Sequence, residues 1–232
     1  YQYEDFNEVA PGVFQLKPEI PNNTNERANI KPGDPKLKDI NGDGKVTAED
    51  QTVIGHGLPI HTGGFTNNCE WTGFDLSIFF QWSYGNDVIN YNRARLESLD
   101  GRHLNQLATV KNHWTPRTTL ADNTVVEGNY TNYLWAVNRG LSNIHTSREV
   151  EDASFLRLKN VQLGYHFPNK VLKRLHLSSL RMYISAQNLY TWTSYTGYDP
   201  EVSTRNSAMT RGFDYSAYPK AKTFTFGVEL AL

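Results

Sequence analysis

The pattern in this chain that points most clearly to chemistry is an acidic loop, DINGDGKVTAED, at Asp39–Asp50. Its spacing matches a calcium-binding loop, in which oxygen atoms at positions 1, 3, 5, 7 and 12 surround the ion. Gly44 stands where such loops bend sharply, and the last position holds Asp where an EF-hand has the longer Glu. The five expected ligands are Asp39, Asn41, Asp43, the carbonyl of Lys45, and Asp50. We expect a structural calcium ion here; an ion-free turn rich in Asp, Asn and Gly is the alternative.

Sequence signatures of catalysis are absent. The chain has no G-x-S-x-G, H-E-x-x-H or P-loop motif. His56 and His61 lie on either side of Pro59, where a metal pair is conceivable, but ordinary loop histidines explain them better. The single cysteine, Cys69, excludes an internal disulfide framework and a cysteine-based zinc site. We therefore expect a protein that is not an enzyme.

A second candidate site is aromatic. Tyr130, Tyr133 and Trp135 lie close together in a long polar stretch, where they could stack on a sugar or contact a partner protein. Packing of this stretch against itself explains them at least as well. They are weak candidates for substrate contact.

The composition narrows the class of protein. Among 232 residues, 23 are Lys or Arg and 24 are Asp or Glu, so no excess of charge points to nucleic acid. No stretch approaches the 18 consecutive apolar residues that indicate a transmembrane helix. The low mean hydropathy resembles that of a soluble protein. A β-barrel wall can be equally polar, however, because only alternate residues of each strand face lipid.

Five segments alternate between apolar and polar residues with the period of two that indicates a β-strand. In the clearest, Phe74–Tyr84, Phe79 is the one apolar residue on the polar side. The five expected strands are about 61–71, 74–84, 154–167, 180–192 and 222–232. The apolar residues of the two clearest strands are expected to face lipid: Leu76, Ile78, Phe80, Phe224, Phe226, Val228 and Leu230.

The sequence also predicts a tight turn and a β-bulge within this set of strands. A tight turn is expected at Thr72-Gly73, between the first two strands. In the third strand, Leu156 and Leu158 are out of phase with the apolar residues that follow, and a β-bulge near Lys159-Asn160 would reconcile them.

The lengths of the strands and connections favour a membrane wall. The runs have eleven to fourteen residues, whereas tilted membrane strands need about 9–11 and globular strands average about 5–6. The connections alternate in length, with long ones at 85–153 and 193–221. Outer-membrane barrels have short periplasmic turns and long outer loops. We expect an extracellular segment at 1–60, and barrel strands with long extracellular loops at 61–232.

Five strands are too few for a closed barrel, since bacterial barrels have at least about eight. An open sheet edge in lipid would leave backbone groups without hydrogen bonds. We therefore expect the other strands of this barrel to lie elsewhere, and Tyr1 not to be a natural start.

Several runs, taken in order, resemble the C-terminal end of the SusC/RagA family of TonB-dependent outer-membrane transporters. The most specific are ASFLRLKNVQLGYHFP, from Ala153, and AQNLYTWTSYTGYDPE, from Ala186. The resemblance implies an all-β fold, namely the C-terminal strands of a barrel of about 22 strands with a plugged lumen. It also implies a multi-pass protein of the bacterial outer membrane.

The resemblance further implies partners. These are the N-terminal plug and remaining strands of the same barrel, a SusD-type surface lipoprotein, TonB, and an oligosaccharide or peptide substrate. TonB would act through the N-terminal part, which this chain does not include. The resemblance identifies no ligand residue in the variable loops.

Two other functions are consistent with parts of the pattern. A secreted, calcium-stabilised β-sandwich that binds carbohydrate would be a soluble, self-sufficient domain. A calcium-dependent glycosidase would need two carboxylates facing each other across a cleft, and nothing singles out such a pair.

Overall fold

The computed structural model describes residues 1–23, 29–99, 105–137, 145–201 and 211–232. Parts of the long connections expected at 85–153 and 193–221 therefore lie outside the described residues. The chain forms two compact units, one of residues 1–54 with 92–146 and the other of 55–91 with 147–232. This grouping differs from the expected division after residue 60, because residues 92–146 pack with the N-terminal segment.

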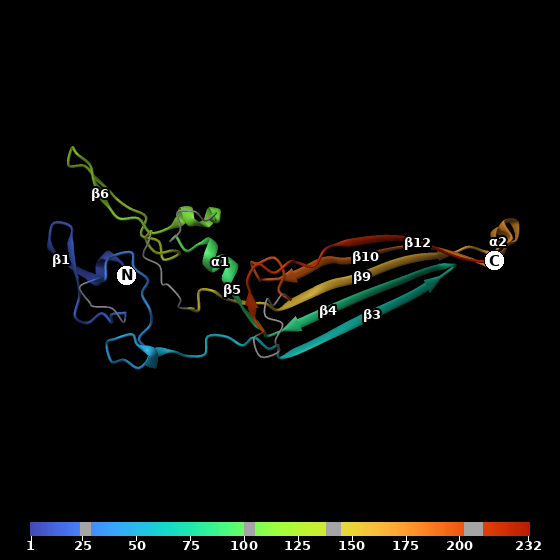
Figure 1. Ribbon diagram of the computed structural model, residues 1–232, viewed down its shortest axis with the longest axis horizontal. Coiled ribbons are helices and arrows are strands. Elements are labelled where there is room, and N and C mark those ends of the chain that lie inside the picture. Colours follow the sequence, from blue (N-terminus) through green and yellow to red (C-terminus); the bar gives the residue numbers. More distant parts are fainter. Residues whose placement is uncertain (24–28, 100–104, 138–144, 202–210) are drawn as a thin grey trace. The chain divides into compact units, whose positions relative to one another are not determined.

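The second unit is built on one antiparallel sheet of long strands, in the order β12-β10-β9-β4-β3 (Figure 1). These strands are β3 (His61–Trp71), β4 (Phe74–Tyr84), β9 (Phe155–His166), β10 (Ser179–Thr193) and β12 (Thr223–Ala231). The bounds of β3 and β4 match the alternating runs exactly, and those of β9, β10 and β12 differ from them by one residue at each end. The helix α2 (Asn169–Leu175) lies in the short connection between β9 and β10.

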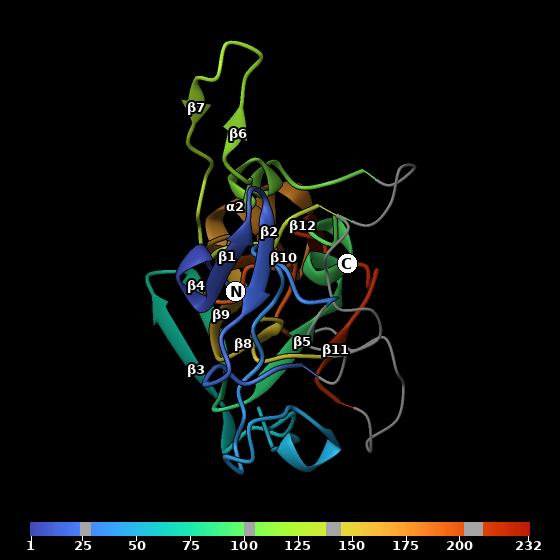
Figure 2. The same cartoon turned by 90° about the vertical axis from the view of Figure 1, so that its left-hand side faces the viewer.

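Smaller elements make up the rest of the structure. The second unit also has a three-stranded sheet, in the order β11-β5-β8, and the first unit has two ribbons, β1–β2 and β6–β7 (Figure 2). No helix within the described residues is long and apolar enough to span a membrane. The smaller strands are β1 (Phe6–Ala10), β2 (Val13–Leu16), β5 (Asp87–Asn90), β6 (Thr118–Thr119), β7 (Val125–Val126), β8 (Val150–Asp152) and β11 (Phe213–Asp214). The other helical segments are α1 (Tyr91–Leu96) and the 3-10 turns Tyr3–Asp5, Ala48–Asp50 and Ala108–Asn112.

The connections of the large sheet differ at its two ends. At one end, Thr72 (φ 44°) and Gly73 (φ 90°) join β3 to β4. Positive φ at both central residues is typical of the type I′ turn, one of the two favoured two-residue hairpin turns. The connection through α2 lies at the same end, whereas the long connections leave from the other end. The tight turn and the alternation of connection lengths are as the sequence predicts.

A bulge in β9 keeps its apolar residues on one face. Against β4, Asn160 pairs with Phe79 and Leu158 with Phe80, so Lys159 is the extra residue. Directly opposed residues of antiparallel strands share a face. Leu156 and Leu158 therefore lie on the same face as Val161, as expected from the sequence.

The register gives the sheet one apolar and one polar face. Across the strands, Phe226, Ile184, Leu163 and Leu76 form one row, and Glu229 and Arg181 belong to the opposite face. Within this chain, Phe226, Ile184 and Leu163 are exposed, with Phe226 at 63 %, and Leu76 is half-buried. We name the two sides the apolar face and the polar face.

Aromatic rings cover glycines in this sheet. A Cβ atom on Gly227 would lie 2.3 Å from the ring of Tyr183, and one on Gly64 would lie 2.7 Å from the ring of Phe79. The glycines leave space that a neighbouring ring fills, which stabilises a strand with no side chain of its own at that point. Phe79, the apolar exception on the polar face, is explained in this way.

We expect the two faces to differ in their access to water in the full-length protein in its membrane. In a Cys69→Ser background, Leu76→Cys and Phe226→Cys should resist a water-soluble maleimide, whereas Ser77→Cys and Thr225→Cys should react. A lysine at Ile78 should destabilise the fold by about 2–4 kcal/mol, because a charge at mid-membrane on the lipid side is costly. Equal labelling of both sets would contradict the assignment of the faces.

Candidate functional site

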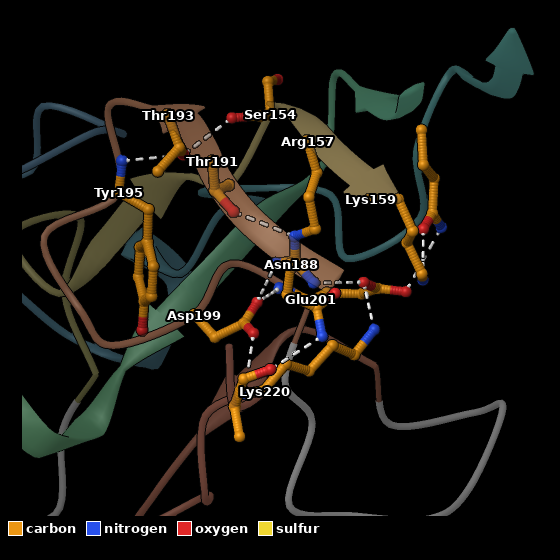
Figure 3. A network of polar contacts seen from close by, with 12 residues as sticks. Ser154, Arg157, Lys159, Asn188, Thr191, Thr193, Tyr195, Asp199, Glu201 and Lys220 are labelled. Atoms are coloured by element: carbon orange, nitrogen blue, oxygen red, sulfur yellow. Dashed lines mark hydrogen bonds and ion pairs between the residues drawn. The ribbon is translucent and has the colours of Figure 1, made fainter. Parts of the chain in front are cut away.

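The polar face carries a buried arginine close to the end from which the long connections leave. Arg157, the third residue of β9, is only 1 % exposed. Its Nε donates to Thr191 Oγ1 of β10 at 2.9 Å, and its Nη2 donates to Asp199 Oδ1 at 2.6 Å (Figure 3). Its Nη1 donates to Glu201 Oε2 at 3.0 Å. A buried guanidinium is tolerated only when it is paired in this way.

Asp199 extends the network into the last long connection. Its carboxylate is 4 % exposed and accepts from the backbone N–H groups of Glu201 at 2.9 Å and Lys220 at 3.2 Å. Burial by itself would raise the pKa of Asp199, but these N–H donors and the Arg157 guanidinium outweigh burial and lower it. Asp199 is therefore charged at neutral pH and joins Glu201 and Lys220 to β9.

Glu201 links the network to a third strand. It forms an ion pair with Lys220 and accepts a hydrogen bond from Gln81 of β4 at 3.4 Å. Lys159, the bulged residue of β9, donates to Gln81 Oε1 at 2.6 Å. Three strands of the wall and both sides of the 202–219 stretch thus meet in one network of three cations and two carboxylates, which we name the Arg157 network.

A second contact holds the same connection to the small sheet. Tyr195 is buried beside Val88 and Ala153, and its hydroxyl donates to Asp214 Oδ2 at 2.7 Å. Burial first, and the Asp214 carboxylate second, raise the pKa of Tyr195, so it acts as a neutral donor. The connection after β10 is therefore held to the wall, and its first residues are held to β11, which lies later in the same connection.

At the other end of the polar face lies a smaller charged cluster. Arg181 donates to Asp75 Oδ2 at 2.6 Å and lies 3.2 Å from Glu229. His166 Nε2 is 3.2 Å from Asp75 Oδ1. Between this cluster and the Arg157 network the face carries mainly uncharged polar groups: Asn68, Ser77, Gln162, Ser185 and Thr225.

The residues expected to bind calcium all lie in one loop of the first unit. Asp39 accepts from the N–H groups of Gly42 at 2.7 Å and Gly44 at 2.8 Å, both of which have positive φ. Asn41 accepts from Asp43 N, and Asp43 from Lys45 N. The side chains that would bind the ion are thus turned towards backbone donors of their own loop.

Asp50 closes this loop. Its carboxylate accepts from Thr47 N at 2.7 Å and Ile40 N at 2.8 Å, and these donors lower its pKa. Among the described residues, however, no three His, Cys, Asp or Glu side chains form a group that could hold a metal ion. The donor set has the hard oxygens that calcium requires, but the carboxylates are not gathered around one point.

The three aromatic candidates make contacts inside the first unit. Tyr133 donates to the buried Glu97 at 2.9 Å, and Trp135 Nε1 donates to the carbonyl of Ser98 at 3.2 Å. The ring of Tyr130 lies against Tyr3 and Trp114, with centroids 5.3 and 5.9 Å apart. These contacts support the packing explanation, and substrate contact stays a prediction.

Sequence reasoning singled out the runs that contain Arg157 and Asp199, but not the pairing between them. The available signal was a charged residue between Leu156 and Leu158 in a strand, with two acidic residues far downstream. Arg157 and Asp199 are 42 residues apart, and only the folded sheet brings them together.

Known proteins resemble this chain over most of its length. No family model matches it. It is 36 % identical over 206 residues to the TonB-dependent receptor P3 of Formosa agariphila, covering 86 % of this chain and 19 % of that protein. It is 28 % identical over 206 residues to the TonB-dependent receptor SusC of Bacteroides thetaiotaomicron, and the match covers 87 % of this chain and 18 % of that protein.

A solved structure, that of the RagAB peptide transporter, matches with a TM-score of 0.66 and 28 % identity, covering 84 % of this chain and 20 % of that one. The chain thus spans about a fifth of the length of each of these three proteins.

Removal of Arg157 should release the connection after β10 from the wall. Arg157→Met leaves the carboxylate of Asp199 buried without its guanidinium, which costs about 3–5 kcal/mol for a buried pair. Arg157→Lys should recover only part of this, because an ammonium cannot reproduce the planar fork of donors. Hydrogen exchange of residues 194–201 and 218–222 in the full-length protein measures the effect.

The matched control is Arg174→Met, which removes an exposed arginine from α2. It should leave exchange in both segments unchanged. Unchanged exchange in Arg157→Met would show that the network does not hold the connection.

Proposed function

Because the chain belongs to the TonB-dependent receptors of the SusC and RagA type, we propose that it serves in the import of oligomeric nutrients through the outer membrane. The observation that carries this proposal is the sheet: long antiparallel strands with one apolar and one polar face, and long connections at one end only. Such a sheet lines a transmembrane passage with its polar face. The relatives are receptors and transporters, which agrees with a protein that is not an enzyme.

An oligosaccharide is the first candidate substrate and a peptide the second. In support of a glycan, the middle of the polar face offers amides and hydroxyls without charge, including Gln162, Ser185 and Thr225. Such groups exchange hydrogen bonds with sugar hydroxyls. In support of a peptide, RagAB is a peptide transporter.

The proposal includes three kinds of partner. The rest of the barrel pairs with the outer edges of β3 and β12, since each has a neighbour on one side only within the described residues. A SusD-type surface lipoprotein captures the substrate above the barrel, and TonB supplies energy through the N-terminal part of the receptor. The similarity to SusC and RagAB supports both of these partners.

The rival secreted sandwich would need a second sheet against the apolar face. The described elements form no such layer, and Trp71 and Phe226 of this face are 75 % and 63 % exposed. A bilayer accounts for this exposure better than a soluble domain does.

We expect uptake of an oligomer to depend on the full-length receptor. Deletion of its gene should abolish or strongly reduce growth on one class of oligosaccharide or peptide, while growth on the corresponding monomers continues. A surface lipoprotein should co-purify with the receptor in detergent. Undiminished growth on every oligomer, with no paralogue compensating, would refute the transport role.

We also propose that the Asp39–Asp50 loop binds calcium as a structural ion. Its oxygen donors and the positive φ of Gly42 and Gly44 support this. Binding would turn the carboxylates of Asp39, Asp43 and Asp50 from backbone donors of the loop towards the ion. The ion would offset the repulsion between the three carboxylates and order the loop.

Calcium should therefore slow hydrogen exchange in residues 39–50 of the full-length receptor. Asp43→Ala should abolish this protection and leave barrel assembly intact. Glu49→Gln is the matched control, because Glu49 lies in the same loop at a position that supplies no ligand. Exchange that does not respond to calcium in the unmodified loop would rule the site out.

A further inference from the structure

The apolar face of the sheet has a groove at the end from which the long connections leave. The groove has a volume of about 380 Å³, and its main lining side chains are His61, Trp82, Tyr84, Leu156 and Trp192. These residues come from β3, β4, β9 and β10, so the groove crosses four adjacent strands. Leu156, between the two tryptophans in the register, forms the floor.

A glycine lets one wall of this groove form. Gly63 of β3 stands opposite Trp82 of β4, and a Cβ atom on Gly63 would lie 2.3 Å from the indole ring. The indole therefore lies across β3, where its Nε1 reaches His61 Nδ1 at 3.2 Å. The other wall is Trp192, whose ring is 4.8 Å from that of Tyr190.

The contacts of His61 decide which of its nitrogens can donate. An indole N–H only donates, so Nδ1 of His61 must be the acceptor. The neutral imidazole then carries its proton on Nε2. Tyr84 stacks on the ring with centroids 5.2 Å apart and an interplanar angle of 23°, which fixes its orientation. The groove thus has an apolar floor, aromatic walls, and one positioned N–H donor at its rim.

The position of the groove indicates which kind of ligand fits it. It is continuous with the apolar face, which lies against the bilayer, and it lies at the end of the long outer connections. Tryptophan and tyrosine side chains lie at the level of the lipid headgroups in membrane proteins. An amphiphile in the outer leaflet offers both an acyl chain for the floor and a headgroup oxygen for the donor.

We propose that this groove is a specific binding site for an outer-leaflet lipid with a phosphate-bearing headgroup. The acyl chain lies over Leu156 between Trp82 and Trp192, and the phosphate accepts a hydrogen bond from His61 Nε2. The site would attach one lipid to the outer rim of the barrel wall, more firmly than the lipids that merely surround the protein.

Two leucines of β9 give a matched test of the groove. Leu156 and Leu163 are 41 % and 40 % exposed and share the apolar face, but only Leu156 lines the groove. The full-length receptor, delipidated in detergent, is titrated with palmitoyl-oleoyl-phosphatidylglycerol, and bound lipid is counted by native mass spectrometry. Leu156→Trp should fill the groove and weaken binding by at least about tenfold, since it removes the space for the chain. Leu163→Trp should change binding by less than about twofold.

Two variants of His61 test recognition of the headgroup. His61→Phe keeps a flat ring without a donor and should weaken binding by about tenfold, the effect of one hydrogen bond to a charged group. His61→Gln carries an amide N–H and should retain most of the affinity. Glycerol phosphate added in excess should not displace the lipid, which distinguishes a lipid site from a phosphate site.

The proposal is overturned if Leu156→Trp and Leu163→Trp lose lipid equally, or if neither loses any, because the bound lipids would then be unspecific. It is also overturned if His61→Phe binds as tightly as the unmodified receptor, or if glycerol phosphate competes. Heat-modifiable mobility on gels, a property of folded barrels, confirms that each variant is assembled.

Discussion

Backbone N–H and C=O groups within a bilayer find no water, so each must be paired inside the protein. The large sheet of this chain obeys that constraint through continuous pairing of β12, β10, β9, β4 and β3. The pairing in turn determines which side chains share a face. Because Lys159 is accommodated as a bulge, β9 keeps its partners on both sides and its leucines on the apolar face. The separation into an apolar and a polar face therefore depends on backbone hydrogen bonding.

On the polar face, the cost of removing charge from water shapes the structure. Arg157 is almost fully buried, and it satisfies its donors with Thr191, Asp199 and Glu201. The two carboxylate partners come from the long connection after β10. Removal of one partner would leave a buried charge, which is far more costly than loss of an exposed ion pair. The connection is thereby positioned beside the polar face, where substrate would pass in a transporter.

Aromatic side chains make different kinds of contact on the polar face, on the apolar face and in the first unit. Within the sheet, Phe79 and Tyr183 cover glycines of the neighbouring strand. At the rim of the apolar face, Trp82 covers Gly63 and also donates to His61, so the same ring fills a gap and positions a polar side chain. In the first unit, Tyr133 and Trp135 instead bind groups of their own unit. The same residue types thus cover glycines in one place, orient a histidine in another and hold a loop in a third, according to what surrounds them.

The sequence by itself determined the strands, the Thr72-Gly73 turn and the bulge at Lys159, because alternation and turn chemistry are local properties of the chain. It also indicated the membrane wall, because the lengths of the strands and of their connections are visible in the sequence without knowledge of any tertiary contact. Only the tertiary structure decided that Arg157 binds Asp199 and that Trp82 orients His61. These contacts join residues 42 and 21 positions apart, and they depend on strand register. The grouping of residues 92–146 with the N-terminal segment was also beyond the sequence, because packing between distant segments leaves no periodic signal along the chain.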